Sequence, residues 1–208
     1  MVAPGNELVP LVVVGDRAAY LRSGMPRAGS ARDVLADAAR LEADEHPRWA
    51  VASAATSLRA LVEAGVGPAR SWDLAEGHRI LHGGWAAGPG LVHAVLRGLA
   101  PEGIPEAREA DLFDLAVDPL ADEHPDAPIG PDGYLRADAF TPVWADRDAR
   151  LLALAAVVGD LAGIQRERLG AVGARAVATA YSESAAAVLC LELERDGLPI
   201  DRPRAEAL

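Results

Sequence analysis

The chain has 208 residues, half of them hydrophobic, a formal net charge of −11 and a single cysteine. This length allows one sizeable domain with an apolar core, whereas one cysteine excludes a disulfide framework and fits a cytoplasmic protein. An acidic chain does not by itself attract nucleic acid, because binding to the phosphate backbone requires clustered basic side chains. No basic signal-peptide region precedes the first apolar run, and no segment approaches the ~18 apolar residues of a membrane span. We therefore expect no membrane partner.

Strand and helix patterns alternate over the first 70 residues. β-branched and apolar runs bounded by Gly, Asp or Pro are typical of strands, and apolar residues at helical spacing are typical of amphipathic helices. Ser30 is expected to cap the first helix, and Gly65 to end the second. The predicted strands cover 8–16, 17–22 and 48–53, and the predicted helices cover 30–47 and 56–65. This alternation predicts an α/β layer.

The pattern beyond residue 70 is helical, with one long interruption. Segment 100–142 is rich in Pro, Gly, Asp and Glu, and its apolar residues gather at Leu112, Phe113 and Leu115. Such a composition predicts a long acidic loop. The predicted helices cover 73–82, 89–99, 144–169 and 171–195, with Gly170 between the last two.

The segment "SWDLAEGHRILHGG" contains the most concentrated polar pattern of the chain. Asp73 stands at the start of a predicted helix, and Glu76 follows three residues later, which is a complete N-cap arrangement. A metal-binding or catalytic role for Asp73 is the alternative. His78 and His82 are four residues apart, a spacing that suits two zinc ligands. However, "HRILH" lacks the glutamate of the zinc-protease motif, so we expect ordinary, partly buried histidines.

Other chemically suggestive residues lack the context that their chemistry requires. Ser182 and Ser184 flank Glu183, but no nucleophile elbow or histidine partner accompanies them. The loosely spaced glycines at 83, 84, 88 and 90 follow a helix rather than a strand, so they do not form a phosphate-binding loop. The four tryptophans are expected to be core anchors or interdomain contacts, with base stacking as the alternative; they are Trp49, Trp72, Trp85 and Trp144.

The end of the chain carries a family resemblance. The segment "ESAAAVLCLELERDGLPID", residues 183–201, resembles the part of family-A DNA polymerases that leads from the exonuclease domain into the polymerase domain. In that family a glutamate begins a helix and an apolar run follows. The helix ends in the motif Glu-Arg-x-Gly, and an aspartate follows shortly after the glycine. The residues that match in order and spacing are Glu183, Glu194, Arg195, Gly197 and Asp201.

The upstream sequence is similar to the actinobacterial variant of this family, the bifunctional 3′-5′ exonuclease/DNA polymerases. The similar stretches are "SWDLAEGHRILHGGW", "GLVHAVLRGLAPEG" and "ADLFDLAVDP". The resemblance implies an α/β fold of the RNase-H-like, DnaQ-type exonuclease class, a small sheet with a helix-rich C-terminal half. It also implies a degenerate exonuclease-like domain over 1–169 and a helix over 170–208 that leads into a polymerase domain not contained in this sequence.

Proofreading members of this family cut the 3′-terminal phosphodiester with two metal ions held by carboxylates. Their first motif is Asp-x-Glu on the first strand, where this chain has only Asp16 at the strand's end. Their second motif places an aspartate in the following helix, where this chain reads "VASAATSLRALVEAG". Their third motif is Tyr-x-x-x-Asp, where this chain has Asp160 but Ala156. We therefore assign no catalytic, metal-binding or cofactor-binding residue; the carboxylates that an altered site could use are Asp16, Asp73 and Asp160.

Three functional hypotheses follow. The first is a structural domain of a family-A DNA polymerase, acting in DNA replication or repair, without nuclease activity of its own. Its partners would be the polymerase domain of the same chain and, through the parent protein, DNA; Mg²⁺ is expected only for the parent polymerase. The second is a stand-alone, non-enzymatic interaction module. The third is a weak metal-dependent 3′-5′ nuclease, which requires the three candidate carboxylates, in an altered arrangement, to converge within about 6 Å, close enough to share metal ions.

Overall fold

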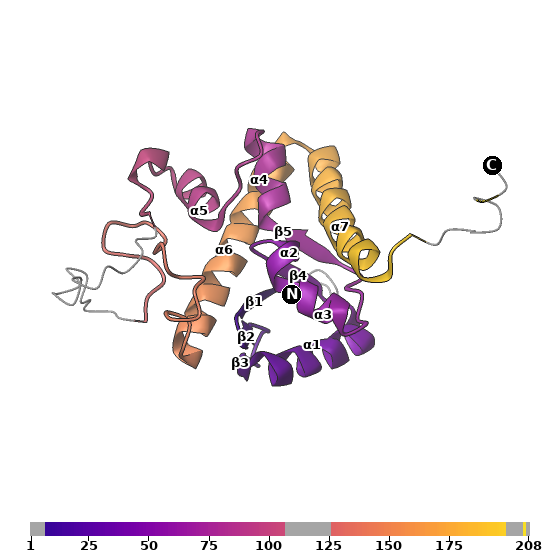
Figure 1. Cartoon of the computed structure of the whole chain (residues 1–208). Helices are drawn as coiled ribbons and strands as arrows, with labels where there is room; N and C mark the ends of the chain where they lie inside the picture. The colour runs from indigo at the N-terminus through magenta and orange to yellow at the C-terminus, as the bar shows by residue number, and fades with distance from the viewer. Residues whose placement is uncertain (1–6, 107–125, 199–205, 207–208) are drawn as a thin grey trace.

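A computed structural model describes residues 7–106, 126–198 and 206 of the chain (Figure 1). Its centre is a mixed five-stranded sheet with the strand order β3-β2-β1-β4-β5. Strands β1, β2 and β3 pair antiparallel, whereas β4 and β5 continue the sheet parallel to β1. The strands are β1 (Leu8–Val14), β2 (Arg17–Tyr20), β3 (Arg27–Ser30), β4 (Arg48–Val51) and β5 (Ser71–Asp73).

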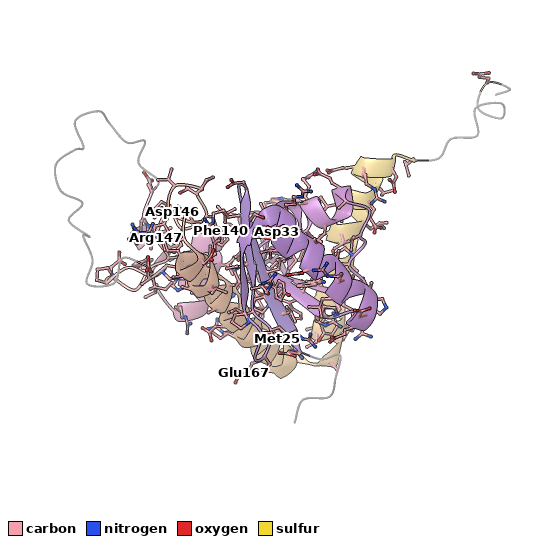
Figure 2. The ribbon with its side chains drawn as sticks, turned by 90° about the horizontal axis from the view of Figure 1, so that it is seen from below. Met25, Asp33, Phe140, Asp146, Arg147 and Glu167 are labelled. Carbon is pink, nitrogen blue, oxygen red and sulfur yellow. The ribbon has the colours of Figure 1, made fainter. Side chains whose placement is uncertain are left out.

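Helices cover both faces of this sheet and one of its edges. Helices α1, α2 and α3 lie on one face, α6 crosses the other, and α7 packs along β5 (Figures 1 and 2). Helices α4 and α5 follow β5 and pack against α6. Their bounds are α1 (Ala31–Glu45), α2 (Ala54–Ser57), α3 (Arg59–Glu63), α4 (Leu74–His82), α5 (Pro89–Arg97), α6 (Asp148–Val172) and α7 (Ala174–Asp196), with a short 3₁₀ turn, η1, at Pro101–Gly103.

Strand β1 explains why the sheet is covered on both faces. Successive side chains of a strand point to opposite faces, and in β1 both sets are apolar. Val9 and Leu11 belong to the core cluster formed with α1 and α3, whereas Val12 and Val14 belong to the cluster formed with α6. A strand that is apolar on both faces is typical of a sheet buried between two helical layers. The α/β expectation and the helix-rich C-terminal half are therefore confirmed.

Two strands were not expected from the sequence. β3 has no buried residue and contains no apolar run, so its pairing with β2 is the only feature that defines it. β5 is only three residues long, all buried, and its Ser-Trp-Asp sequence has no β-branched residue. The helix predicted from residue 73 consequently begins at Leu74, directly after this strand.

Two predicted helices, over 56–65 and 144–169, differ from the structure, and the second begins later than expected, at Asp148. The single helix expected over 56–65 is two short helices, α2 and α3, separated at Leu58, and α2 begins earlier than expected, at Ala54. At the C-terminal end α6 continues through Gly170 to Val172, and Gly173 separates it from α7. Gly173 has a φ of +143°, which a residue with a Cβ rarely adopts, so the chain reverses there.

Residues 126–142, the described part of the acidic segment that precedes α6, pack against the core of the domain. Leu135 and Ala139 are buried in the same core cluster as α6, and Ile129 pairs with Leu135 in an isolated bridge. The expected apolar element at Leu112, Phe113 and Leu115 lies outside the described residues. The part of this segment that precedes α6 is therefore a packed part of the domain.

Helix α7 departs from the expectation that no segment could span a membrane. By length and composition alone this 23-residue helix is apolar enough to do so, although it contains charged residues such as Glu183. In the structure α7 packs against β5, α3, α4 and α6. Core helices of globular proteins also meet this criterion, but they are mostly buried, whereas only 22% of the apolar stretch of α7 is buried.

Candidate functional site

A cavity of about 400 Å³ opens at the carboxyl ends of β1 and β4. In open α/β sheets the crevice beyond the carboxyl ends of the parallel strands is the usual place for a ligand, and this volume lies within the range of ligand pockets. The walls are mostly small and apolar. The lining residues are Val13, Val14, Gly15, Ala52, Ser53, Thr56, Ala75, Arg79, Ala87, Gly88, Pro89 and Phe140.

No carboxylate lines this cavity among the described residues, and Arg79 is the only charged residue there. Arg79 lies on α4, where its Nη1 pairs with Glu76 and its Nε donates to the carbonyl of Trp85 at 3.4 Å. Ser53 precedes α2 as its N-cap residue, but its hydroxyl makes no capping hydrogen bond. The polar groups of the cavity are therefore hydroxyls and a guanidinium, which suit an anion and not a divalent cation.

Asp73 lies buried beside this cavity without lining it. Its Oδ1 accepts hydrogen bonds from the backbone N–H groups of Ala75 at 2.8 Å and Glu76 at 3.3 Å, which caps α4. Its Oδ2 accepts from the N–H of Ala54 at 2.7 Å, the first residue of α2. Burial raises the pKa of this carboxyl, opposed by the hydrogen bonds from the same backbone donors. The predicted N-cap role is confirmed, and the bond to α2 adds a tertiary role that the sequence did not indicate.

The three candidate carboxylates have three different environments. Asp16 is exposed in the turn that joins β1 and β2. Asp160 lies on α6, with 53% of its side chain exposed, and forms an ion pair with Arg97. Among the described residues no group of three or more His, Cys, Asp or Glu side chains is placed to hold a metal ion. The structure thus does not bring Asp16, Asp73 and Asp160 together in the arrangement that the nuclease alternative requires.

The two histidines of α4 differ in burial. His78 is 3% exposed, and its Nδ1 has no hydrogen-bond partner, whereas His82 is exposed. Their ring centroids are 4.9 Å apart. Burial lowers the pKa of His78, and the nearby His82 and Arg79 lower it further. The pair has no third ligand in the part of the chain that the structure describes.

Three of the four tryptophans are core anchors as expected. Trp49 donates to the buried carboxylate of Glu42 at 2.7 Å, and Trp144 packs in the α6 cluster. Trp72 donates to Oε1 of Gln165 at 3.0 Å, which joins β5 to α6. Trp85 is not a core anchor, because it is 91% exposed in the loop before α5, so an interdomain contact or base stacking stays a prediction for this residue.

Helix α7 contributes structural contacts. Ser184 is buried, and its Oγ accepts from the backbone N–H of Asp73 at 3.0 Å and donates to the carbonyl of Ala180. These bonds give Ser184 a structural role. In the family that the chain resembles, a glutamate begins the corresponding helix, whereas Glu183 lies in the interior of α7, in agreement with the helix predicted over 171–195.

The end of α7 agrees with its predicted ending. Gly197 has a φ of +73° and forms the C-terminal turn. Glu194 pairs with Arg59 at 2.9 Å, and Arg195 donates to the carbonyl of Val62, so both side chains fix α7 to α3. Asp201 lies outside the described residues.

The polar residues of the cavity could not be recognised from the sequence. Ser53 and Thr56 lie in the stretch where the second exonuclease motif would place an aspartate. Nothing in the sequence indicated that these two residues face a cavity. Arg79 lies between the two histidines that drew attention instead. Phe140 comes from the loop that precedes α6 (Figure 2) and carried no signal in the sequence.

The chain matches no protein-family model, and comparisons with curated proteins and with solved structures also find no significant similarity. The assignment of function therefore rests on the residues and on the geometry.

Proposed function

We propose that this chain is an RNase-H-like, DnaQ-type exonuclease domain that has lost its metal-binding carboxylates. It would serve as the N-terminal structural platform of a family-A DNA polymerase acting in DNA replication or repair in the cytoplasm. Its partners would be the polymerase domain of the same chain and, through that domain, DNA. The proposal is based on the resemblance of residues 183–201 to that family, and residues 183–196 of this segment lie on α7.

The carboxylate-free cavity is the observation that carries the proposal. The strand order 3-2-1-4-5 is compatible with an RNase-H-like sheet, in which metals would be held at the carboxyl ends of β1 and β4. Here Val13, Val14 and Ser53 line that place. Two-metal phosphodiester hydrolysis needs carboxylates to hold both cations, so the residues present do not fit a pair of Mg²⁺ ions. No hydrolytic step is derived for this chain, and Mg²⁺ is expected only for the parent polymerase.

The charge of the domain fits a platform better than a DNA-binding surface. A net charge of −11 opposes contact with a phosphate backbone. Most described arginines are paired with acidic side chains or donate to carbonyls, as Arg97 does with Asp160 and Arg195 does with Asp196. The polymerase would then supply the basic surface.

Two measurements test this proposal. Digestion of 3′-labelled single-stranded DNA with Mg²⁺ or Mn²⁺ should release no nucleotide above a protein-free control. Metal-dependent release that Asp16→Asn or Asp160→Asn abolishes would instead support the nuclease alternative. The mass of the native protein in its source cells, detected with an antibody to this domain, should be several times 21.7 kDa. A native protein of 21.7 kDa would refute the polymerase platform and favour the interaction module.

A further inference from the structure

Helix α7 is apolar on two opposite faces, and the described elements cover only one of them. The covered face packs against β5, α3, α4 and α6, and its buried residues are Ala180, Ser184, Val188 and Leu191. A helix that is apolar all round is normally buried all round, yet only 22% of the apolar stretch of α7 is buried. Because α7 lies at the rim of the molecule (Figure 1), its other face is exposed.

The exposed face of α7 carries a continuous row of uncharged side chains. Leu189 and Leu193 are 52% and 40% exposed. A single exposed leucine is ordinary, whereas a contiguous apolar surface marks a place of interaction. Small side chains form the amino-terminal half of the row, and the two leucines form its carboxyl-terminal half. We call this row the α7 stripe; its members are Ala178, Ser182, Ala185, Ala186, Leu189 and Leu193.

Opposite charges bound the α7 stripe at its two ends. Arg175 precedes the stripe and Asp196 follows it, and both residues are exposed. Asp196 pairs with its neighbour Arg195, and no ion pair within the described residues involves Arg175. The helix dipole favours acidic side chains at the amino end and basic ones at the carboxyl end, so neither charge stabilises α7 through the dipole. A surface with the opposite order of charges would pair with both.

A second α7 running in the opposite direction has that order of charges. A two-fold axis at the middle of the stripe, between Ala185 and Ala186, places Arg175 of each copy opposite Asp196 of the other. In a parallel pair, equal charges would meet instead. The same axis sets large side chains against small ones, as knobs-into-holes packing requires; the opposed pairs are Leu193 with Ala178 and Leu189 with Ser182.

We propose that the α7 stripe is a homodimer interface in which two copies of α7 pack antiparallel. A two-fold dimer uses the same patch on both subunits, and this stripe is complementary to itself in charge and in side-chain size. The contact between residues 178 and 193 would be ~24 Å long. One helix pair of this length is a small interface, so we expect a Kd on the order of 10–100 µM. The proposal concerns the surface of the domain and does not rest on attachment to a polymerase.

Sedimentation equilibrium of the whole chain between about 5 and 500 µM tests this proposal. The measurement uses about 0.15 M salt, which screens the repulsion between two chains of charge −11. The mass should rise from 21.7 kDa toward twice that value. Leu189→Arg should raise the Kd at least 10-fold with an unchanged circular dichroism spectrum, because the position is exposed and arginine is a good helix former. Met25→Arg is the matched control: Met25 is 55% exposed but lies between β2 and β3, so the Kd should not change.

An exchange of charges tests the antiparallel direction. Arg175→Asp and Asp196→Arg should each raise the Kd several-fold, because like charges then meet at both ends of the stripe. An equimolar mixture of the two variants should recover the dimer, since opposite charges again face each other at both ends. Only a contact between two chains in the antiparallel direction gives this recovery.

A monomer at about 500 µM, or a dimer that Leu189→Arg leaves unchanged, would overturn the proposal. A mixture of the two charge variants that fails to recover the dimer would overturn the antiparallel arrangement. A monomer that floats with vesicles of phosphatidylcholine and phosphatidylglycerol would instead identify a lipid surface as the occupant of the stripe. None of these outcomes affects the nuclease test, and the mass test of the platform is made on denatured protein, which distinguishes a longer chain from a dimer.

Discussion

Replacement of Asp73 should destabilise the domain, because this one carboxylate holds the starts of two helices. Asp73→Ala removes the cap of α4, a loss of about 1 kcal/mol. It also leaves the N–H of Ala54 without its acceptor, which costs a further ~1–3 kcal/mol for a buried donor. The combined loss of about 3 kcal/mol corresponds to a fall in Tm of roughly 6–12 °C for a domain of this size.

Two milder replacements divide this loss between the two helices. Asp73→Ser can still cap α4, but its shorter side chain cannot also reach Ala54, so its loss should be smaller than that of Asp73→Ala. Asp73→Asn keeps one carbonyl oxygen for the cap and turns its amide toward the N–H of Ala54, placing donor against donor. Burial disfavours the charged form of Asp73, as its raised pKa shows. The neutral asparagine does not carry this free-energy cost, which offsets part of the lost stability.

Urea unfolding followed by tryptophan fluorescence measures these differences, since Trp72 is fully buried in β5 next to Asp73. Asp160→Ala is the matched control, because this half-exposed carboxylate forms one surface ion pair and its loss should cost at most about 1 kcal/mol. If Asp73→Ala unfolded at the same urea concentration as the unmodified protein, the assignment of Asp73 as a structural link would be refuted.

Two further predictions concern packing and pH. Gly77→Ala should lose about 1–3 kcal/mol of stability, because the new Cβ would lie 2.4 Å from Oε1 of the fully buried Gln165. Gly163→Ala, with nothing near its Cβ position, should be neutral or stabilising by up to ~1 kcal/mol; equal urea midpoints for the two variants would contradict this reasoning. Burial also lowers the pKa values of His78 and His93. Their contribution to stability should be full above the unfolded pKa of about 6.5 and decline as the pH falls below it, which urea midpoints between pH 7.5 and 5 would show; a flat profile would refute it.

Much of the fold could be predicted because its signals are local. The apolar run of β1 and the cap of α1 by Ser30 depend on residues adjacent in sequence. So does the turn at Gly197 that ends α7. Such features are reported by periodicity and capping preferences, which act within a few residues.

The errors have one physical cause, which is that tertiary contacts override local preference. β3 exists because it pairs with β2, and β5 because its three buried residues continue the sheet beside β4. Helix α2 begins at Ala54 because the carboxylate of Asp73, distant in sequence, accepts its N–H. No window of neighbouring residues contains that information.

The candidate site divides in the same way. The sequence by itself showed that the carboxylates of the motifs of the family that it resembles are missing from the corresponding stretches, because residue types at given positions need no coordinates. It also determined that Asp73 caps a helix, since N-cap preference is local. Only the tertiary structure decided that Arg79, Ser53, Thr56 and Phe140 line one cavity. These side chains come from separate elements, and their proximity arises from the packing of α4, α2 and the loop before α6 around the carboxyl ends of two parallel strands.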